Sequence, residues 1–269
     1  MKHLIGQLKV FGKSLRAGAI LLLDYDGTLV PIAEKPELAI LPTDMRALLS
    51  SLAKRFRIAI ISGRSLDEVK NLVGVREIYY VGNHGFEIDG PGTRLLRSEA
   101  KRARPLIAKI CARLRESLGA ISGAIVEDKG LTASVHYRQV ARKELRCMKN
   151  IFEKVVRPHI NSGRIRLTHG KKVFEIRPNI EWDKGKAALW IIDVIDPKKK
   201  LTPVYMGDDR TDEDAFLALK RRGITILISE KRKRSNAKFF LKNVAEVKRF
   251  LKKLVDETKP RRCLSFEIE

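Results

Sequence analysis

A continuous apolar run near the start of the chain leads directly into acidic residues. The run extends from Ala19 to Leu23, and the segment Asp24-Tyr25-Asp26-Gly27-Thr28 follows it. A short apolar run that ends in polar loop residues is typical of a strand buried on both faces, as in a parallel sheet. Ligands bind at the carboxyl ends of the strands in open α/β sheets. The run therefore predicts a doubly wound parallel sheet with Asp24 and Asp26 at its ligand-binding edge.

Strand and helix signals alternate on both sides of the chain's middle, which supports this α/β fold. The expected elements before the middle are a helix at Asp44–Phe56, a strand at Arg57–Ile61, a helix opened by a capping box of Ser65 and Glu68, and a strand at Ile78–Val81. Those after it are a helix at Asp183–Asp193, a strand at Pro203–Met206, a helix capped by Thr211 with Asp214 and ending at Gly223, a strand at Ile224–Ile228, and a last helix opened by Asn243 and Glu246.

The middle of the chain has a different pattern. Helical stretches near Glu99–Leu118 and Ala141–Val156 are each followed by strand signals, and Leu131–Arg138 and Val173–Arg177 alternate between polar and apolar residues. Clean alternation indicates an antiparallel sheet with one polar face. We therefore expect an inserted α+β unit at 98–178, within a core made of 1–97 and 179–269.

Two more motifs fall at strand ends or helix starts. In Ser62-Gly63-Arg64, a hydroxyl and backbone N–H groups follow a strand and precede a helix, where a phosphate oxygen can bind. Lys184 lies in the first turn of a helix, where a cation opposes the helix dipole unless a bound anion compensates. Taken singly, an ordinary helix start and a solvated surface lysine are the better explanations of these residues.

An acidic cluster at 207–214 contrasts with the chain's formal net charge of +23. Close carboxylates repel one another unless they are solvated or bind a cation, and oxygen ligands suit Mg²⁺. Asp208 and Asp209 are the candidate ligands, while Asp214 also has the capping task described above. Together the four motifs supply a nucleophile, a hydroxyl, a cation and a metal site, which is the set that phosphoryl transfer needs.

Composition excludes several other classes of protein. The first thirty residues lack a secretory pattern, no apolar stretch approaches the length of a membrane span, and three widely spaced cysteines (Cys111, Cys147 and Cys263) do not form a disulfide framework. These features predict a cytoplasmic protein with no membrane partner. The basic charge permits a nucleic-acid partner, but no RNA-binding signature accompanies it, so we do not expect one. The oligomeric state stays open.

The ordered motifs resemble those of the haloacid dehalogenase superfamily, and within it the trehalose-6-phosphate phosphatase family. The resemblance covers nearly the whole chain and rests on LLLDYDGTL from Leu21, ISGR from Ile61, VGNHGFEI from Val81, VEDKG from Val126, HYR from His136, FEIRPN from Phe174, WDKG from Trp182 and GDDRTDEDAF from Gly207. It implies a haloacid-dehalogenase-like core with a mobile cap, and hydrolysis of trehalose 6-phosphate to trehalose and phosphate.

The resemblance also implies a role for each residue. Asp24 would attack phosphorus and become an aspartyl phosphate, and Asp26 would be the general acid and base. Ser62 and Lys184 would bind phosphoryl oxygens. Mg²⁺ would be held by Asp24, the backbone carbonyl of Asp26 and Asp208, with Asp209 as a further ligand or support and Asp212 outside the ligand set.

Substrate-binding residues are implied on both sides of the expected cleft: Arg64, Asn83, His84, Gly85 and Glu87 on the core, and Glu127, Lys129, Arg138 and Glu175 on the cap. His136 is equally well explained as a residue that packs beside Tyr137, and Trp182 is expected to be a packing residue beside Lys184. Two alternatives remain open: a phosphatase of the same superfamily for glucosylglycerol or mannosylglycerate phosphate, and a basic nucleic-acid-binding protein on an enzyme fold.

Overall fold

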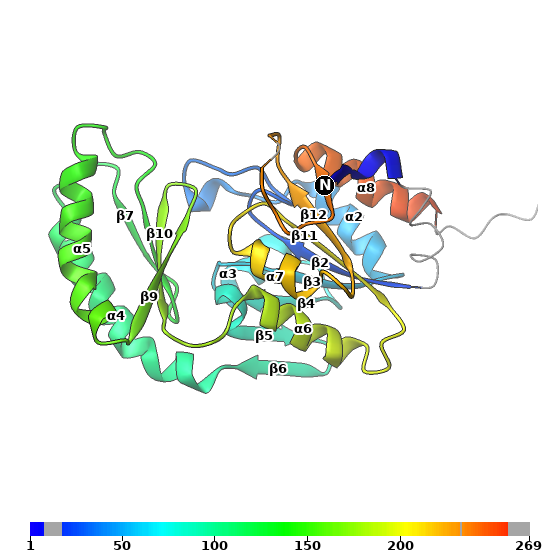
Figure 1. The fold of residues 1–269 in the computed structure, drawn as a ribbon, viewed down its shortest axis with the longest axis horizontal. Coiled ribbons are helices and arrows are strands. Elements are labelled where there is room, and N and C mark those ends of the chain that lie inside the picture. The colour runs from blue at the N-terminus through cyan, green and yellow to red at the C-terminus, as the bar shows by residue number, and fades with distance from the viewer. Residues whose placement is uncertain (8–17, 232, 258–269) are drawn as a thin grey trace, which may run out of the picture.

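The computed structural model describes residues 1–7, 18–231 and 233–257, and these residues form two sheets with their helices (Figure 1). Cys263 lies outside the described residues. Among the described residues, no helix is both long and apolar enough to cross a membrane.

The larger sheet has nine strands in the order β1-β13-β12-β11-β2-β3-β4-β5-β6. All pairs from β1 to β4 are parallel, and β5 and β6 extend the sheet antiparallel. The strands are β1 (Lys2–His3), β2 (Ala19–Asp24), β3 (Arg57–Ile61), β4 (Tyr79–Gly82), β5 (Glu87–Gly90), β6 (Thr93–Leu96), β11 (Thr202–Gly207), β12 (Ile224–Ile228) and β13 (Phe239–Leu241).

Helices cover both faces of this sheet, so its central strands are buried on both sides. One apolar core joins the sheet to α2 (Thr43–Ala53), α3 (Leu66–Val73) and α8 (Val244–Glu257), and another joins it to α6 (Lys184–Ile195) and α7 (Asp212–Ala218). Short 3-10 turns lie at η1 (Leu4–Gln7), η2 (Pro36–Leu38) and η3 (Asn83–Gly85). Full burial of β2 explains why its sequence is a continuous apolar run that ends at Asp24.

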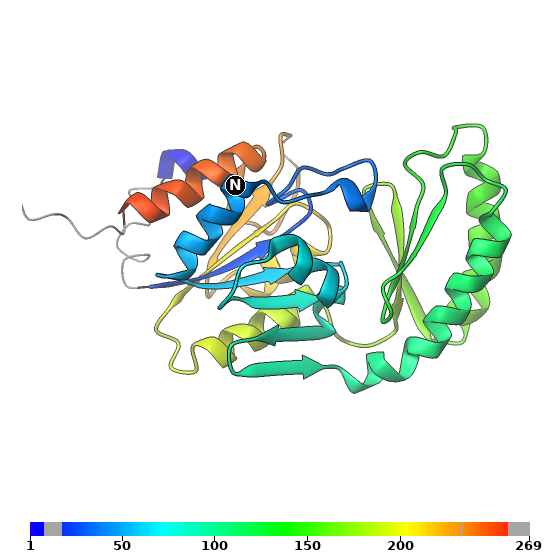
Figure 2. The same ribbon diagram turned by 180° about the vertical axis from the view of Figure 1, so that it is seen from behind.

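The smaller sheet is antiparallel, in the order β7-β8-β10-β9. Its strands are β7 (Ile125–Asp128), β8 (Ala133–His136), β9 (Ile165–Gly170) and β10 (Val173–Pro178), and its helices are α4 (Ser98–Leu118) and α5 (Leu145–Asn161). Both helices pack on the face turned away from the larger sheet (Figures 1 and 2). The polar face therefore looks toward the carboxyl ends of the parallel strands. The first helix of this unit begins at Ser98, and its last strand ends at Pro178.

The helix starts at Ser65 and Asn243 are confirmed, because each side chain accepts a hydrogen bond from the backbone N–H three residues later, but Glu68 does not close the capping box and pairs with Arg64 instead. The capping box at Thr211 is wrong: Thr211 is already helical and buried and forms no side-chain cap, and α7 ends at Ala218 instead of Gly223. The helix expected at Ala141–Val156 begins and ends later, at Leu145–Asn161, because residues 142–144 form a turn and the helix continues through Pro158.

Candidate active site

The carboxyl ends of β2, β3 and β11, together with the start of α6, bring the four core motifs into one cavity. Asp24, Ser62, Lys184 and Asp208 all line it and are all buried. Gly27 makes the close approach of two of these motifs possible: it has φ +84°, and a Cβ there would collide with the carboxylate of Asp208. The convergence that we expected from strand order is therefore present in the structure.

Three carboxylates lie together at the centre of this cavity. Ligand oxygens of Asp24, Asp208 and Asp212 all lie within 4.8 Å of one another, and all three residues are buried. The ammonium of Lys184 donates to Asp24 Oδ1 at 2.7 Å and to Asp212 Oδ1 at 2.8 Å. Lys184, at the start of α6, is thus compensated by two carboxylates of the protein. Asp209 lines the cavity but lies outside this group of three.

The acidic group has too little positive charge around it. Burial raises the pKa of Asp24 well above its usual 3.8; Lys184 opposes this, and the carboxylates of Asp212 and Asp208 add to it. Burial raises the pKa of Asp208 to about 6, with Lys171 opposing and Asp212 adding. Burial would lower the pKa of Lys184, but Asp212 and Asp24 raise it well above 10.5. Three buried carboxylates that have only two ammonium groups beside them, those of Lys184 and Lys171, fit a divalent cation with oxygen ligands.

Asp212 is held differently from the other two acids. Its Oδ1 accepts from Lys184 and from the hydroxyl of Tyr205 at 2.8 Å, and its Oδ2 accepts from the backbone N–H groups of Asp208 and Asp209 at 3.0 Å each. These bonds fix the acidic loop against β11. Asp212, which the resemblance placed outside the ligand set, therefore holds the backbone of the acidic loop in position.

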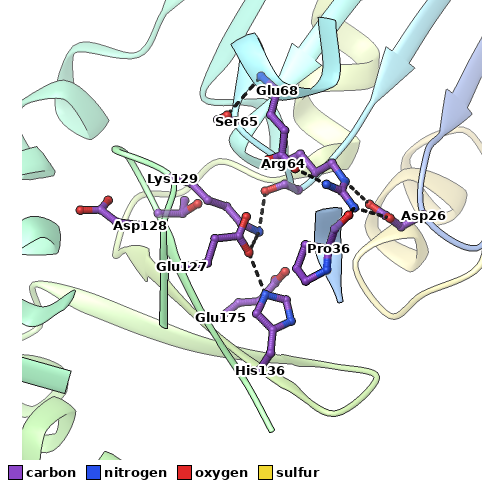
Figure 3. Close-up of polar contacts among 12 residues, drawn as sticks. Asp26, Pro36, Arg64, Ser65, Glu68, Glu127, Asp128, Lys129, His136 and Glu175 are labelled. Carbon is purple, nitrogen blue, oxygen red and sulfur yellow. Dashed lines mark hydrogen bonds and ion pairs between the residues drawn. The ribbon is translucent and has the colours of Figure 1, made fainter. Parts of the chain in front are cut away.

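Asp26 is held by Arg64. The guanidinium donates to Asp26 Oδ2 at 2.8 Å and to Oδ1 at 2.9 Å, and it also pairs with Glu68 and donates to the carbonyl of Pro36 (Figure 3). Arg64 was expected to bind substrate; it lines the cavity, but its hydrogen bonds go to Asp26 and to the loop around Pro36. These bonds fix the Asp26 carboxylate at the cavity that Asp24 also lines.

The smaller sheet faces the cavity with charged side chains. Glu127 Oε2 accepts from His136 Nε2 at 2.7 Å and lies 3.7 Å from the ammonium of Lys129, which in turn donates to the carbonyl of Gly63 at 3.1 Å (Figure 3). Burial would raise the pKa of Glu127, but Lys129 and His136 outweigh it and lower the pKa to about 2. Arg138 also lines the cavity and donates to the carbonyl of Ala33 in the loop after Asp26.

Glu175 lies deeper, between the two sheets. Its Oε2 accepts from Arg177 Nη2 at 2.5 Å and lies 3.1 Å from His84 Nε2, while Arg177 also donates to His84 Nδ1 at 2.8 Å. Burial and Arg177 lower the pKa of His84 to about 3, so the ring is neutral at neutral pH. Burial would raise the pKa of Glu175, but His84 and Arg177 hold it well below its usual 4.5.

Three of the expected substrate-binding residues do not line the cavity: Asn83, Gly85 and Glu87. They form a joint between the sheets instead. Asn83 Oδ1 accepts from Thr132 Oγ1 at 2.6 Å, and its Nδ2 donates to Glu87 at 2.7 Å and to the carbonyl of Lys129 at 3.2 Å. The carbonyl of Gly85 accepts from the indole of Trp182 at 2.7 Å, so Trp182 is a packing residue.

Some residues that line the cavity were not predicted as site residues from the sequence. Lys171, Ser134 and the segment at 32–36 all line it. Ser134 lies on the polar face that alternation predicts for β8, so that pattern contains a signal for it. Lys171 is one of many basic residues in a chain of net charge +23, and nothing in the sequence distinguishes it.

Comparison with known proteins identifies the family of this site. The model of the family described as trehalose-phosphatase matches residues 22–245. The chain belongs to the trehalose-phosphatase family. It is 39% identical over 250 residues to trehalose-phosphate phosphatase B of Arabidopsis thaliana, covering 88% of this chain and 66% of that protein. It is also 39% identical over 255 residues to a probable trehalose-phosphate phosphatase 4 of Oryza sativa subsp. japonica, covering 92% and 69%. The chain thus spans about two thirds of the length of these relatives.

Solved structures agree with the fold. A protein related to trehalose-6-phosphate phosphatase superposes with a TM-score of 0.76 at 25% identity, over 88% of this chain and 97% of that one. The C-terminal domain of the trehalose-6-phosphate phosphatase of C. albicans superposes with a TM-score of 0.80 at 21% identity, over 95% and 98%. The resemblance seen in the motifs is confirmed, as is the fold of a haloacid-dehalogenase-like core with a cap. The named relatives are phosphatases, the class of enzyme that the motifs predict.

Proposed function

We propose that this protein hydrolyses trehalose 6-phosphate to trehalose and phosphate. The observation that carries the proposal is the placement of Asp24 between Ser62, Lys184 and Asp208, beneath a sheet whose polar face meets the same cavity. The family membership given above supports the phosphatase chemistry, and the names of the relatives support trehalose phosphate as substrate.

In this proposal a carboxylate oxygen of Asp24 attacks phosphorus, and the bond from phosphorus to the sugar oxygen breaks. Asp26 gives a proton to that oxygen, and then takes one from the water that hydrolyses the aspartyl phosphate. Arg64 positions Asp26 for both steps, while Lys184 and the hydroxyl of Ser62 stabilise charge on the phosphoryl oxygens.

Asp24 and Asp208, with the backbone carbonyl of Asp26, would hold Mg²⁺ in this mechanism. The cation would neutralise the phosphoryl oxygens and keep Asp24 ionised. Asp209, expected as a further ligand or a support, lines the same cavity outside the buried group of three, and we propose the supporting role for it.

The cap is proposed to extend over 98–178 and to bind the sugar. Glu127, Lys129, Arg138 and Glu175 present charged groups to the cavity, and such groups form directed hydrogen bonds with hydroxyls. A cytoplasmic location is proposed as well, consistent with the free thiols of Cys111 and Cys147.

A substrate panel tests this function. Phosphate release is measured with trehalose 6-phosphate, sucrose 6-phosphate, glucosylglycerol phosphate and mannosylglycerate phosphate, with Mg²⁺ and with EDTA. We expect Mg²⁺-dependent release that is fastest with trehalose 6-phosphate. Equal rates on all four esters would contradict the proposed substrate.

Asp24→Asn is the matched variant for the mechanism. An amide is not a nucleophile at phosphorus, so we expect turnover to fall below detection while circular dichroism stays unchanged. A variant that keeps about a tenth of the wild-type rate would exclude an aspartyl-phosphate intermediate, since removal of a nucleophile typically costs on the order of 10⁴ or more in rate.

A further inference from the structure

One cation of the smaller sheet reaches the acidic group of the core. Lys171 lies at the tip of the β9–β10 hairpin, and its ammonium donates to Asp208 Oδ2 at 2.6 Å. The Lys171 side chain is 52% exposed, whereas that of Asp208 is 4% exposed. The hairpin therefore brings a partly solvated charge to a buried carboxylate of the proposed metal site.

The hairpin tip is held in this place by further contacts. Arg138 donates to the carbonyl of Lys171 at 2.9 Å and to the carbonyl of Ala33 in the core. A Cβ at Gly170 would lie 3.2 Å from Asp209 Oδ2, so the backbone of the tip packs directly against the acidic loop. The position of Lys171 is thus set by the contact between cap and core.

The charges make the position of Lys171 dependent on what else the cavity holds. Lys184 forms ion pairs with Asp24 and Asp212. Among the described residues, Lys171 is the one whose side chain forms an ion pair with Asp208. A divalent cation held by Asp24 and Asp208 would use the Asp208 carboxylate to which Lys171 donates, and it would repel the ammonium. A phosphoryl dianion bound beside the metal would reverse this repulsion and attract Lys171 again.

We propose that Lys171 couples metal and phosphate binding: it competes with Mg²⁺ for Asp208 when no phosphate is present, and it binds a phosphoryl oxygen when both are present. This inference rests on the proposed function, because it assumes that Mg²⁺ and phosphate share this cavity. In this proposal Lys171 is the cap residue that contacts the phosphoryl group of the substrate, so that closure of the cap over the core depends on that group. Glu127 and Glu175 contact the sugar.

Binding measurements test the coupling without turnover. Isothermal titration calorimetry at pH 7.5 gives the affinity for Mg²⁺ alone, and then for inorganic phosphate in saturating Mg²⁺, for wild type, Lys171→Ala and Lys172→Ala. Lys172 is the matched control because it is the adjacent, exposed lysine of the same tip, and no ion pair of its side chain is found among the described residues. We expect Lys171→Ala to bind Mg²⁺ about three- to tenfold more tightly and phosphate about tenfold more weakly, with Lys172→Ala like wild type.

The outcomes separate this inference from the proposed function. Affinities of Lys171→Ala that equal those of Lys172→Ala in both titrations would overturn the coupling and leave the phosphatase site intact. Weaker Mg²⁺ binding by Lys171→Ala would overturn the competition. If neither wild type nor Lys172→Ala bound phosphate in a Mg²⁺-dependent way, the proposed function would fall, and the coupling with it.

Discussion

Glu175 lies where the polar face of the smaller sheet, the loop after β4 and the cavity meet. The motifs alone predict that Glu175→Ala impairs activity on trehalose 6-phosphate more than activity on p-nitrophenyl phosphate. A hydrogen bond to a charged group contributes about 1.5–3 kcal/mol, so we expect a ten- to hundredfold loss of kcat/KM on the sugar phosphate. The small ester does not reach this part of the cap and should change little. Equal losses on both esters would assign Glu175 to general support of the site.

The contacts of Glu175 call for a second variant in that experiment. Glu175→Ala leaves the buried guanidinium of Arg177 without its carboxylate, which destabilises the fold as well as the sugar site. Glu175→Gln keeps an acceptor of the same size. Melting temperatures of both variants show how much of any lost activity comes from unfolding.

His84 predicts an acid-sensitive contribution to stability. The pKa of His84 is about 3 in the folded protein, compared with 6.5 for an ordinary histidine in the unfolded chain. Between these two pH values the unfolded chain binds the proton and the folded chain does not. The contribution is complete above pH 6.5 and decreases as the pH falls toward 3. The free energy of unfolding that is lost in this way between pH 6.5 and pH 4.5 is about 2–3 kcal/mol.

His84→Asn is the variant that removes this titration, because asparagine tolerates the left-handed backbone at this position, where φ is +57°. We expect the variant to lose less of its free energy of unfolding than wild type between pH 6.5 and 4.5, as measured by urea denaturation. His169→Asn, at an exposed position of β9, is the control. Parallel pH profiles for wild type and His84→Asn would contradict the assignment.

The two sheets are held together where the turn after β4 in the core contacts the loop before β8 in the cap. Thr132 donates to Asn83, which in turn holds Glu87 and the carbonyl of Lys129. Both Thr132 and Asn83 are buried, so water cannot replace a lost partner. The smaller sheet is therefore fixed to the core by a network of side-chain hydrogen bonds in addition to the two chain crossings.

Thr132→Val tests this joint. Valine keeps the shape but leaves Asn83 Oδ1 without its donor, which costs about 1–3 kcal/mol. In a chain of this size that corresponds to a fall in melting temperature of roughly 2–4 °C per kcal/mol. Thr132→Ser keeps the hydroxyl and should melt within about a degree of wild type. The joint is disproved if valine and serine variants melt alike by calorimetry.

Mg²⁺ should stabilise the complete protein, because it relieves repulsion among the three buried carboxylates. At a concentration of 100 Kd the gain is about 2.7 kcal/mol. Asp208→Asn should lose this gain, and its metal-free form should melt above metal-free wild type, since one charge of the cluster is gone. Thermal scans with Mg²⁺ and with EDTA measure both effects.

Asp209→Asn is the matched control for Asp208. Its carboxylate lies outside the group of three, so the Mg²⁺-dependent rise in melting temperature should survive. Loss of the rise in Asp209→Asn, with retention in Asp208→Asn, would reverse our choice of ligand.

Local patterns were sufficient for the parallel core and for the chemistry at its edge. The apolar run that ends at Asp24 is visible because β2 is buried on both faces. The alternation in β8 is visible because one face of that strand packs in the apolar core with α4 and α5, while the other faces the polar cavity. Strand order then places Asp24, Ser62 and Asp208 together without any knowledge of side-chain packing, because the carboxyl ends of parallel strands share one edge, whereas Lys184 joins them from the start of α6.

The partners of charged residues could not be predicted in this way. Arg64 pairs with Asp26, Lys171 reaches Asp208, and Asn83 joins the sheets across 49 residues of sequence. Each of these contacts depends on how a cap hairpin or loop meets the core, which no periodicity records. In a chain with 55 lysines and arginines, position in space alone decides which cations face a buried carboxylate and which face water.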